Sequence, residues 1–432
     1  MYCGSCMLDN ALARAIIRRG HECLLVPLYT PIRTDEEDVS VDRVFFGGVN
    51  VYLQQKIPLL ARLPRWLDAA LNNATLVRRA TANTGKTSPK LLGQLTASML
   101  RGSGGNQRKE VTRLCEWLRD QIRPDCVVLS NLMIAGSVPQ IRAHHDLPVW
   151  VVLQGDDIFL DSLPQPYRDE SIALMRGLVS SIDGFIFHSH DYAQRMGERL
   201  NIPASKRHVL PLGIDTSDFR GASPAGVREP GSPMRVGYFA RLSPEKGLHR
   251  AVDAFIAVSQ RGDTPPAECH VAGYLGPQHS QFWVEQQAKL RAAGLEGQLR
   301  YAGSVDRLGK LEFLSSIDLL CVPTEYREPK GLFVLEAVAA GTPYLLPAHG
   351  AFVELHERLK FGELFVAGDA DNLAQKLSAA INRHAAGERD RNALATRRLE
   401  LLQEIDIATM ADRMLALLIP DGSAPAVAGH VA

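Results

Sequence analysis

The sequence predicts an α/β protein of two doubly wound domains, each built on a parallel sheet. Its 432 residues are too many for one ordinary core. From residue 125 onward, short apolar runs alternate with amphipathic stretches, which is typical of parallel strands covered by helices on both faces. A Gly-, Pro- and Ser-rich stretch, residues 220–233, interrupts this alternation and indicates a linker between two domains.

Seven short apolar runs are predicted to be buried strands: residues 125–129, 149–153, 184–188, 235–240, 269–273, 318–323 and 343–347. Helices are expected between many of them, including residues 247–260, 282–293 and 308–316.

The predicted division is an N-terminal domain over 1–219, the linker over 220–233 and a C-terminal domain over 234–400. A helix over 401–419 is expected to cross back to the N-terminal domain, followed by a disordered tail over 420–432. Two such domains normally bind a ligand in the cleft between them, beyond the carboxyl ends of the strands.

The composition excludes several classes of protein. Apolar residues make up 46% and charged residues 22% of the chain, as in ordinary globular proteins. Lys plus Arg equals Asp plus Glu at 48 each, which argues against a dedicated nucleic-acid binder. No signal peptide or long apolar run is evident, and the seven cysteines are scattered. We therefore expect a reduced, cytoplasmic protein.

Residues 56–123 form a basic segment, with 13 Lys or Arg against 4 Asp or Glu. One interpretation is a surface that faces the acceptor or touches the inner face of a membrane peripherally. The other is a set of solvated helices packed on the N-terminal domain. We favour the second, because Pro58 and Pro64 interrupt any long amphipathic helix.

The most informative stretch is EPKGLFVLEAVAAGTP, which begins at Glu328. Pro329 and Gly331 do not suit a helix interior, so a helix is expected to begin near Leu332. Its free amides and partial positive charge suit a phosphate. Glu328 precedes this helix and Glu336 lies about one turn inside it. Carboxylates accept several O–H bonds, so the pair suits a sugar and a vicinal diol such as ribose.

A second stretch, RLSPEKG, follows the strand expected at 235–240. Its Arg241 and Lys246 would lie at the carboxyl end of that strand, the usual edge for a binding site in this class of fold. Two fixed cations there would stabilise a departing diphosphate. Taken alone, this pair is equally typical of an ordinary solvated turn.

Together the two stretches resemble the family-4 retaining glycosyltransferases, glycosyltransferase group 1, of the GT-B fold. The signature is Glu328 and Glu336 within E-P-x-G-L-x-x-L-E-A-x-A-x-G-x-P, and the resemblance extends from Gly4 to about Leu418. It implies two Rossmann-like domains facing across a cleft. It also implies hexosyl transfer from a nucleoside-diphosphate sugar to a hydroxyl, with retention of configuration and without a metal or other cofactor.

The resemblance also assigns roles to single residues. Glu328 would face the transferred sugar while Arg241 and Lys246 bind the donor diphosphate, and these three are the catalytic candidates. Glu336 would hold the ribose. Backbone amides would complete donor binding at Gly331, Leu332, Phe333 and, in the N-terminal domain, Gly4. For Gly350 and Glu354, after the next strand, a structural turn and helix start is an equally good interpretation.

The N-terminal half matches the family's glycine loop and first helix but departs from the family twice. The family has a strand before this loop, whereas the printed sequence begins inside it. We expect the true start to lie upstream; the alternative is a domain without a core strand. In addition, Gln154 stands where family members often carry a histidine, and an amide cannot transfer protons as a histidine does.

Gln154 and Asp156 are the acceptor-side candidates, although a loop-capping role for Asp156 is equally plausible. His188 and His190 are expected to be structural. The Cys3 and Cys6 pair has redox spacing, but no second such pair or histidine cluster completes a zinc site.

Three functions remain open from the sequence. The first is a glycosyltransferase acting on a sugar, lipid-linked or small-molecule acceptor. The second is a catalytically silent subunit that binds nucleotide sugar. The third, a glycoside hydrolase with two carboxylates, is less suitable because it needs neither a phosphate-binding helix nor a basic pair.

Overall fold

In the computed structural model, residues 4–28, 36–41, 89–221, 232–388 and 391–419 are described. The chain divides into two compact units. Among the described residues, the N-terminal unit comprises 5–210 and 414–419, and the C-terminal unit comprises Gly4 and 211–413. Parts of the predicted linker and basic segment (222–231 and 56–88) and the tail over 420–432 lie outside the described residues. Each unit is described separately below.

The C-terminal unit contains a six-stranded parallel sheet in the order β10-β9-β8-β5-β6-β7. The central neighbours β5 and β8 pair through Val236 with Leu319 and Gly237 with Leu320. The six strands are β5 (Met234–Phe239), β6 (Ala267–Ala272), β7 (Leu299–Gly303), β8 (Leu319–Cys321), β9 (Tyr344–Pro347) and β10 (Glu363–Phe365). Chain order thus reverses between β5 and β8, and this is where a doubly wound sheet normally binds its ligand.

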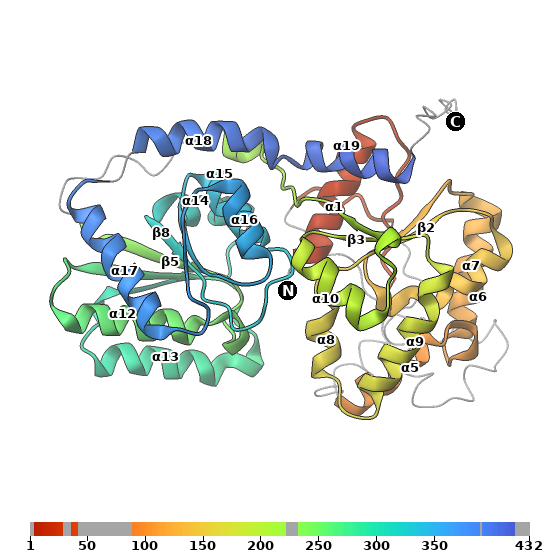
Figure 1. The fold of residues 1–432 in the computed structure, drawn as a ribbon, viewed down its shortest axis with the longest axis horizontal. Helices are drawn as coiled ribbons and strands as arrows, with labels where there is room; N and C mark the ends of the chain where they lie inside the picture. The colour runs from red at the N-terminus through yellow and green to blue at the C-terminus, as the bar shows by residue number, and fades with distance from the viewer. Residues whose placement is uncertain (1–3, 29–35, 42–88, 222–231, 389–390, 420–432) are drawn as a thin grey trace, which may run out of the picture. The chain divides into compact units, whose positions relative to one another are not determined.

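Helices cover both faces of this sheet (Figure 1). On one side lie α12 (Leu248–Arg261), α13 (Ser280–Ala292) and α17 (Ala370–Ala385). On the other lie α14 (Arg307–Ser316), α15 (Leu332–Ala340) and α16 (Ala351–Leu359), with α18 (Arg391–Glu404) packed on α15. Almost all residues of α15 are buried, as expected for a helix that is apolar all round.

The N-terminal unit contains a four-stranded parallel sheet in the order β1-β2-β3-β4. Its strands are β1 (Val127–Leu129), β2 (Val149–Val152), β3 (Gly184–Phe187) and β4 (Arg207–Val209). The helices around it are α1 (Gly4–Ile17), α5 (Pro89–Leu100), α6 (Arg108–Trp117), α7 (Val138–His144), α8 (Asp156–Ser162), α9 (Tyr167–Leu178) and α10 (His190–Leu200). β2 and β3 are buried along their whole length, so their side chains form the centre of this unit's core.

The described part of the basic segment is packed against the N-terminal unit. Six residues of α5 are buried, and Gln94 donates a hydrogen bond to the hydroxyl of Tyr167 on α9 at 3.0 Å. A Cβ on Gly93 would lie 2.7 Å from the Tyr167 Cβ, so the two helices are in close contact. For residues 89–122, the structure therefore agrees with the interpretation of helices packed on the domain.

All seven predicted strands are present, and the three predicted helices correspond to α12, α13 and α14. The sequence interpretation missed β4, β7 and β10. Among the described residues β7 pairs only with β6, and three of its residues are exposed, in keeping with a sequence that has no continuous apolar run. The strand expected ahead of residue 1 lies outside the described residues and stays a prediction.

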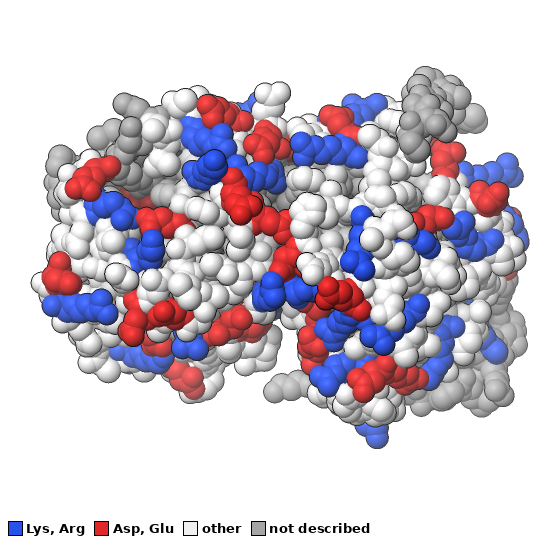
Figure 2. Space-filling view, in the orientation of Figure 1, with Lys and Arg blue, Asp and Glu red and all other residues white. Residues whose placement is uncertain are grey.

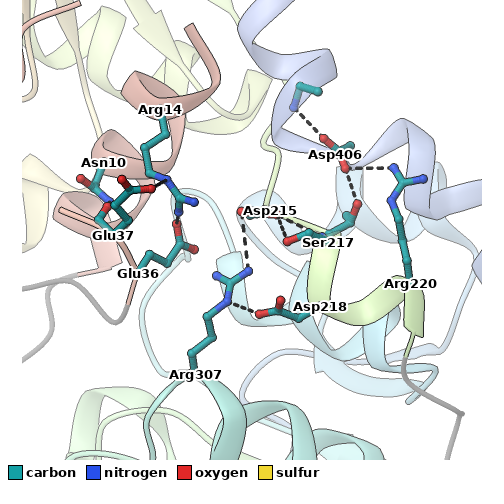
Figure 3. Close-up of polar contacts among 12 residues, drawn as sticks. Asn10, Arg14, Glu36, Glu37, Asp215, Ser217, Asp218, Arg220, Arg307 and Asp406 are labelled. Carbon is teal, nitrogen blue, oxygen red and sulfur yellow. Dashed lines mark hydrogen bonds and ion pairs between the residues drawn. The ribbon is translucent and has the colours of Figure 1, made fainter. Parts of the chain in front are cut away.

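Polar contacts tie residues 211–221 to the start of α19 (Ile407–Leu418) within the C-terminal unit (Figure 3). Ile214 and Asp406 form a parallel bridge. The Asp406 carboxylate accepts hydrogen bonds from the Ala408 amide at 2.7 Å, from Thr216 and from Arg220. In the N-terminal unit, Arg14 of α1 pairs with Glu36 at 2.5 Å, a contact that is also drawn in Figure 3.

On the face shown in Figure 2, acidic and basic side chains are interspersed over both units, in keeping with a net charge of zero. Among the residues that the structure describes, no helix is long and apolar enough to cross a membrane.

Candidate active site

The candidate site lies in the C-terminal unit, where β5 and β8 end side by side. The turn after β5 carries Arg241 and Lys246, and the loop after β8 carries Glu328. The backbone amide of Glu325 donates to the carbonyl of Glu245 at 3.0 Å and so joins the turn to the loop. Residues 82 positions apart in the chain therefore meet at one sheet edge.

Two glycines permit this close approach of backbones. Gly247 has a φ of +75°, and a Cβ there would lie 1.7 Å from the Pro323 carbonyl oxygen. Gly350 has a φ of +56°, and a Cβ there would lie 2.6 Å from the Glu328 carbonyl oxygen. That same oxygen accepts the Ala351 amide at 2.8 Å. The loop before α16 thus supports the backbone of Glu328, so the structure gives Gly350 a structural position.

Glu328 is the centre of the polar contacts. Its side chain is buried, and Lys246 Nζ donates to its Oε2 at 2.8 Å. The hydroxyl of Tyr326 donates to the same oxygen at 3.0 Å, and the Gly331 amide donates to Oε1 at 3.4 Å. Burial would raise the pKa of Glu328, but Lys246 and the hydrogen bond from Tyr326 outweigh it and lower that pKa below its usual value. The carboxylate is therefore charged at neutral pH.

Aromatic rings hold the ammonium group of Lys246. Nζ lies 4.8 Å from the ring centroid of Tyr326 and 5.6 Å from that of Phe333, both within range of a cation–π interaction. Phe333 belongs to the first turn of α15, which begins at Leu332 as predicted. The amides of Leu332 and Phe333 are among the helix-start amides that have no intrahelical partner. The cation and the helix start thus lie next to each other, an arrangement suited to a phosphate.

Arg241 is placed differently from Lys246. Its side chain is 47% exposed and pairs with Glu245 at 3.5 Å. Its main-chain carbonyl accepts the buried hydroxyl of Tyr238 at 3.0 Å, which fixes the turn. The structure therefore brings together Lys246, Glu328 and the start of α15, while Arg241 lies at the exposed rim of the same turn.

Glu336 is paired with a residue that the sequence interpretation missed. Lys310 of α14 donates to Glu336 Oε1 at 2.8 Å, and each side chain is only 9% exposed. The pair joins α14 to α15 beneath the helix start. Lys310 lies on the buried face of α14 with Phe313 and Leu314, and a lysine at apolar spacing was the signal that could have identified it.

The acceptor-side candidates belong to the N-terminal unit and are held by local contacts. Gln154 is buried, and its side-chain Nε2 donates to Asp9 Oδ1 at 2.9 Å. The carboxylate of Asp156 accepts the amides of Leu132 at 3.0 Å and Gln154 at 3.1 Å. Burial raises the pKa of Asp156 to about 6. In this structure Asp156 thus acts as a cap that connects the loops after β1 and β2.

Those of the remaining candidates that the structure describes lie on α1 and directly after β3. Gly4 is the first residue of α1, Cys6 lies on the same helix and Cys3 is outside the described residues. His188 Nδ1 contacts the Leu210 carbonyl at 3.0 Å, and His190 begins α10. Over the described ranges, no group of three or more His, Cys, Asp or Glu side chains is arranged to hold a metal ion.

Two family models match the chain in sequence order. "Glycosyl transferase 4-like domain" matches residues 10–213 and "Glycosyl transferases group 1" matches residues 221–397, so together they span both units. Among curated relatives, glycogen synthase of Mycobacterium tuberculosis is 27% identical over 296 residues, 67% of each chain. Phosphatidyl-myo-inositol mannosyltransferase of Mycobacterium leprae is 35% identical over 181 residues, 42% of this chain and 46% of the relative.

Solved structures show the same fold. Anabaena HepE, in complex with UDP and glucose, matches with a TM-score of 0.58 at 18% identity, covering 72% of this chain and 81% of HepE. Sucrose-phosphate synthase from Thermosynechococcus elongatus matches with a TM-score of 0.56 at 18% identity, covering 72% and 77%.

Proposed function

This chain belongs to the group 1 glycosyltransferases and has the GT-B fold, and on that premise we propose that it is a retaining enzyme that uses a nucleoside-diphosphate sugar. The bond between the sugar C1 and the diphosphate oxygen breaks. A bond from C1 to an acceptor hydroxyl oxygen forms on the same face of the sugar. The products are the glycoside, the nucleoside diphosphate and the proton of the acceptor hydroxyl.

One observation carries this proposal: Lys246 and Glu328 are paired at the start of α15, beyond the carboxyl ends of the neighbouring strands β5 and β8. A diphosphate at the helix start would take Lys246 as its counter-ion, with Arg241 approaching from the rim. Preorganised positive charge of this kind stabilises a leaving phosphate. It would serve in place of a divalent cation, so we expect transfer without added metal.

Glu328 and Glu336 would serve the two ends of the donor. Release of Lys246 to the phosphate leaves the Glu328 carboxylate available to the hydroxyls of the transferred sugar. Glu336, held by Lys310, would accept the two ribose hydroxyls, since a carboxylate takes two O–H bonds at once. The amides of Gly331, Leu332 and Phe333 would complete the phosphate contacts.

The acceptor is proposed only as a hydroxyl on a sugar, a lipid-linked molecule or a small molecule, bound on the side of Gln154 and Asp156. A cytoplasmic location, with peripheral contact to the inner membrane face through residues 56–123, is likewise a proposal. Sedimentation with anionic lipid vesicles, with and without that segment's basic charge, would test the membrane contact.

The donor is best identified by thermal shift with UDP-, GDP- and ADP-sugars, each compared with its nucleoside diphosphate and monophosphate. UDP-glucose is the first candidate, because HepE has been crystallised with it. We expect the nucleotides of one base to raise the melting temperature of the protein. The nucleoside diphosphate of that base should raise it more than the monophosphate does. Hydrolysis of a simple glycoside without any nucleotide effect would instead indicate a glycoside hydrolase. Binding without turnover would indicate a silent subunit.

A further inference from the structure

Tyr326 contacts both of the groups that the proposed reaction depends on. It lies in the loop after β8, two residues before Glu328. Its hydroxyl donates to Glu328 Oε2 at 3.0 Å, the same oxygen that accepts Lys246 Nζ at 2.8 Å. Its ring centroid lies 4.8 Å from Nζ. The phenol edge and the ring face thus make two different contacts, one with the anion and one with the cation.

These contacts restrict two side chains that are otherwise adaptable. Lysine is a point charge on a flexible four-carbon stem, and the rings of Tyr326 and Phe333 confine its ammonium group. A carboxylate that has lost its lysine to a phosphate would still keep the hydroxyl of Tyr326. The phenol also remains a donor over a wide pH range, because burial and the charge of Glu328 raise the pKa of Tyr326 well above its usual value.

The loop that carries Tyr326 is fixed independently of the tyrosine. The carboxylate of Glu325 pairs with His249 at 3.1 Å and with Arg250 at 2.7 Å, both from the first turn of α12. Its amide bonds to the turn after β5. Removing the hydroxyl of Tyr326 should therefore leave the loop in place, so that a substitution reports on the site and not on folding.

We propose that Tyr326 is a positioning residue that holds the carboxylate of Glu328 for the sugar and the ammonium group of Lys246 for the diphosphate. This inference rests on the function proposed above. Tyr326 belongs neither to the pair of glutamates nor to the pair of cations, and its hydroxyl and its ring have separate roles. The hydroxyl raises kcat for transfer, and the ring lowers the KM for the donor.

The test compares Tyr326→Phe, Tyr326→Leu and Glu328→Gln with the wild type, measuring kcat and KM for the donor between pH 5 and pH 9. Tyr344→Phe is the matched control, since Tyr344 is a fully buried tyrosine of β9 that contacts His356. Melting temperatures verify that every variant is folded. The donor is the nucleotide sugar that the thermal-shift screen identifies.

Tyr326→Phe should keep the donor KM within about threefold and lower kcat about tenfold or more at the acidic end of this range, the value of a hydrogen bond to a charged group. The loss should be smaller near pH 8. Without the hydroxyl, Glu328 protonates at a higher pH, so the acidic limb of the profile moves to higher pH. Tyr326→Leu should also raise the KM, because the ring that confines Lys246 is removed. Tyr344→Phe should match the wild type.

A wild-type rate and pH profile for Tyr326→Phe, alongside a strong loss for Glu328→Gln, would overturn this inference and leave the proposed function standing. If the folded wild-type protein transfers sugar from no nucleotide donor, the proposed function fails and this inference fails with it.

Discussion

The loops that follow β8 and β2 both leave the carboxyl end of an inner strand of a parallel sheet, but they hold their carboxylates in opposite ways. In the C-terminal unit, Glu328 is surrounded by donors from side chains, above all the cation of Lys246, and its pKa is lowered. In the N-terminal unit, Asp156 is surrounded by backbone amides, and burial raises its pKa to about 6. The first arrangement provides a charged carboxylate and a cation that can each interact with a ligand. The second mainly fixes the backbone of its loops.

A carboxylate's partners indicate its role better than its burial does, since both side chains are almost completely buried. A lysine side chain can exchange a carboxylate for a phosphate, whereas backbone amides cannot leave without disrupting their loops. We therefore expect substitutions in the C-terminal unit to change binding and turnover, and those around Asp156 to change mainly stability.

The largest effect is expected for Glu328→Gln. The substitution keeps the shape but removes the charge that would face the sugar, so kcat should fall about 100-fold or more. Nucleoside-diphosphate affinity should stay within a few-fold, because the phosphate contacts are made by other groups. Initial-rate kinetics and calorimetry measure the two quantities. Glu312→Gln, an exposed glutamate of α14, is the control, and an equal loss in both variants would contradict the assignment.

Glu336→Ala should have the next largest effect, a loss of nucleotide affinity of about tenfold or more with a smaller change in kcat. It also leaves the buried Lys310 without its carboxylate, at a cost of about 3 kcal/mol in the free energy of unfolding. Denaturant unfolding measures that cost. A double variant, Glu336→Leu with Lys310→Met, should regain most of the stability but not the affinity. Recovery of both would mean that Glu336 has no role in binding.

Asp156→Asn should change stability more than turnover. One of the two carboxylate oxygens becomes an NH2 group that faces a backbone N–H, which costs about 1–3 kcal/mol. Because the folded pKa of Asp156 is raised to about 6, its favourable contribution is complete below about pH 4 and is lost as the pH rises through 6. Unfolding at pH 4.5 and pH 7 should therefore differ less in the variant than in the wild type. An unchanged difference would show that Asp156 does not titrate in this way.

The smallest effect is expected for Gln154→Ala. Its amide donates to Asp9, so we expect a change of no more than about fivefold in kcat and none in the position of the acidic limb. Donor affinity should equal that of the wild type. A loss of kcat comparable to that of Glu328→Gln would show that the N-terminal unit also takes part in the reaction, which would contradict the difference described between the two units.

Much of the fold was predictable because buried parallel strands are continuous apolar runs, as in 149–153 and 184–188. β4 and β10 escaped detection because they are three residues long and carry charged residues, as in Arg207 and Glu363. These two strands form because they pair with the buried strands β3 and β9, and their own sequences carry little signal. The start of α15 was predictable from Pro329 and Gly331, whose chemistry is local.

Only the part of the candidate site that follows from short sequence motifs was predictable. The spacing of Glu328 and Glu336 indicated a donor site, and the sheet edge indicated that Lys246 would approach it. Lys310 and Tyr326 were missed, because their roles come from contacts that only the folded structure shows. Lys310 lies 26 residues before its partner on another helix, and a tyrosine among charged loop residues has no distinctive spacing.

We propose that groups of the C-terminal unit determine nucleotide binding. The most direct test is calorimetric titration of the nucleoside diphosphate chosen by the thermal-shift screen into wild-type protein, Glu336→Ala and Gln154→Ala. Tight binding by the wild type and Gln154→Ala, with affinity about tenfold or more lower in Glu336→Ala, is the predicted result. Equal affinity in all three, or an equal loss in both variants, would contradict it.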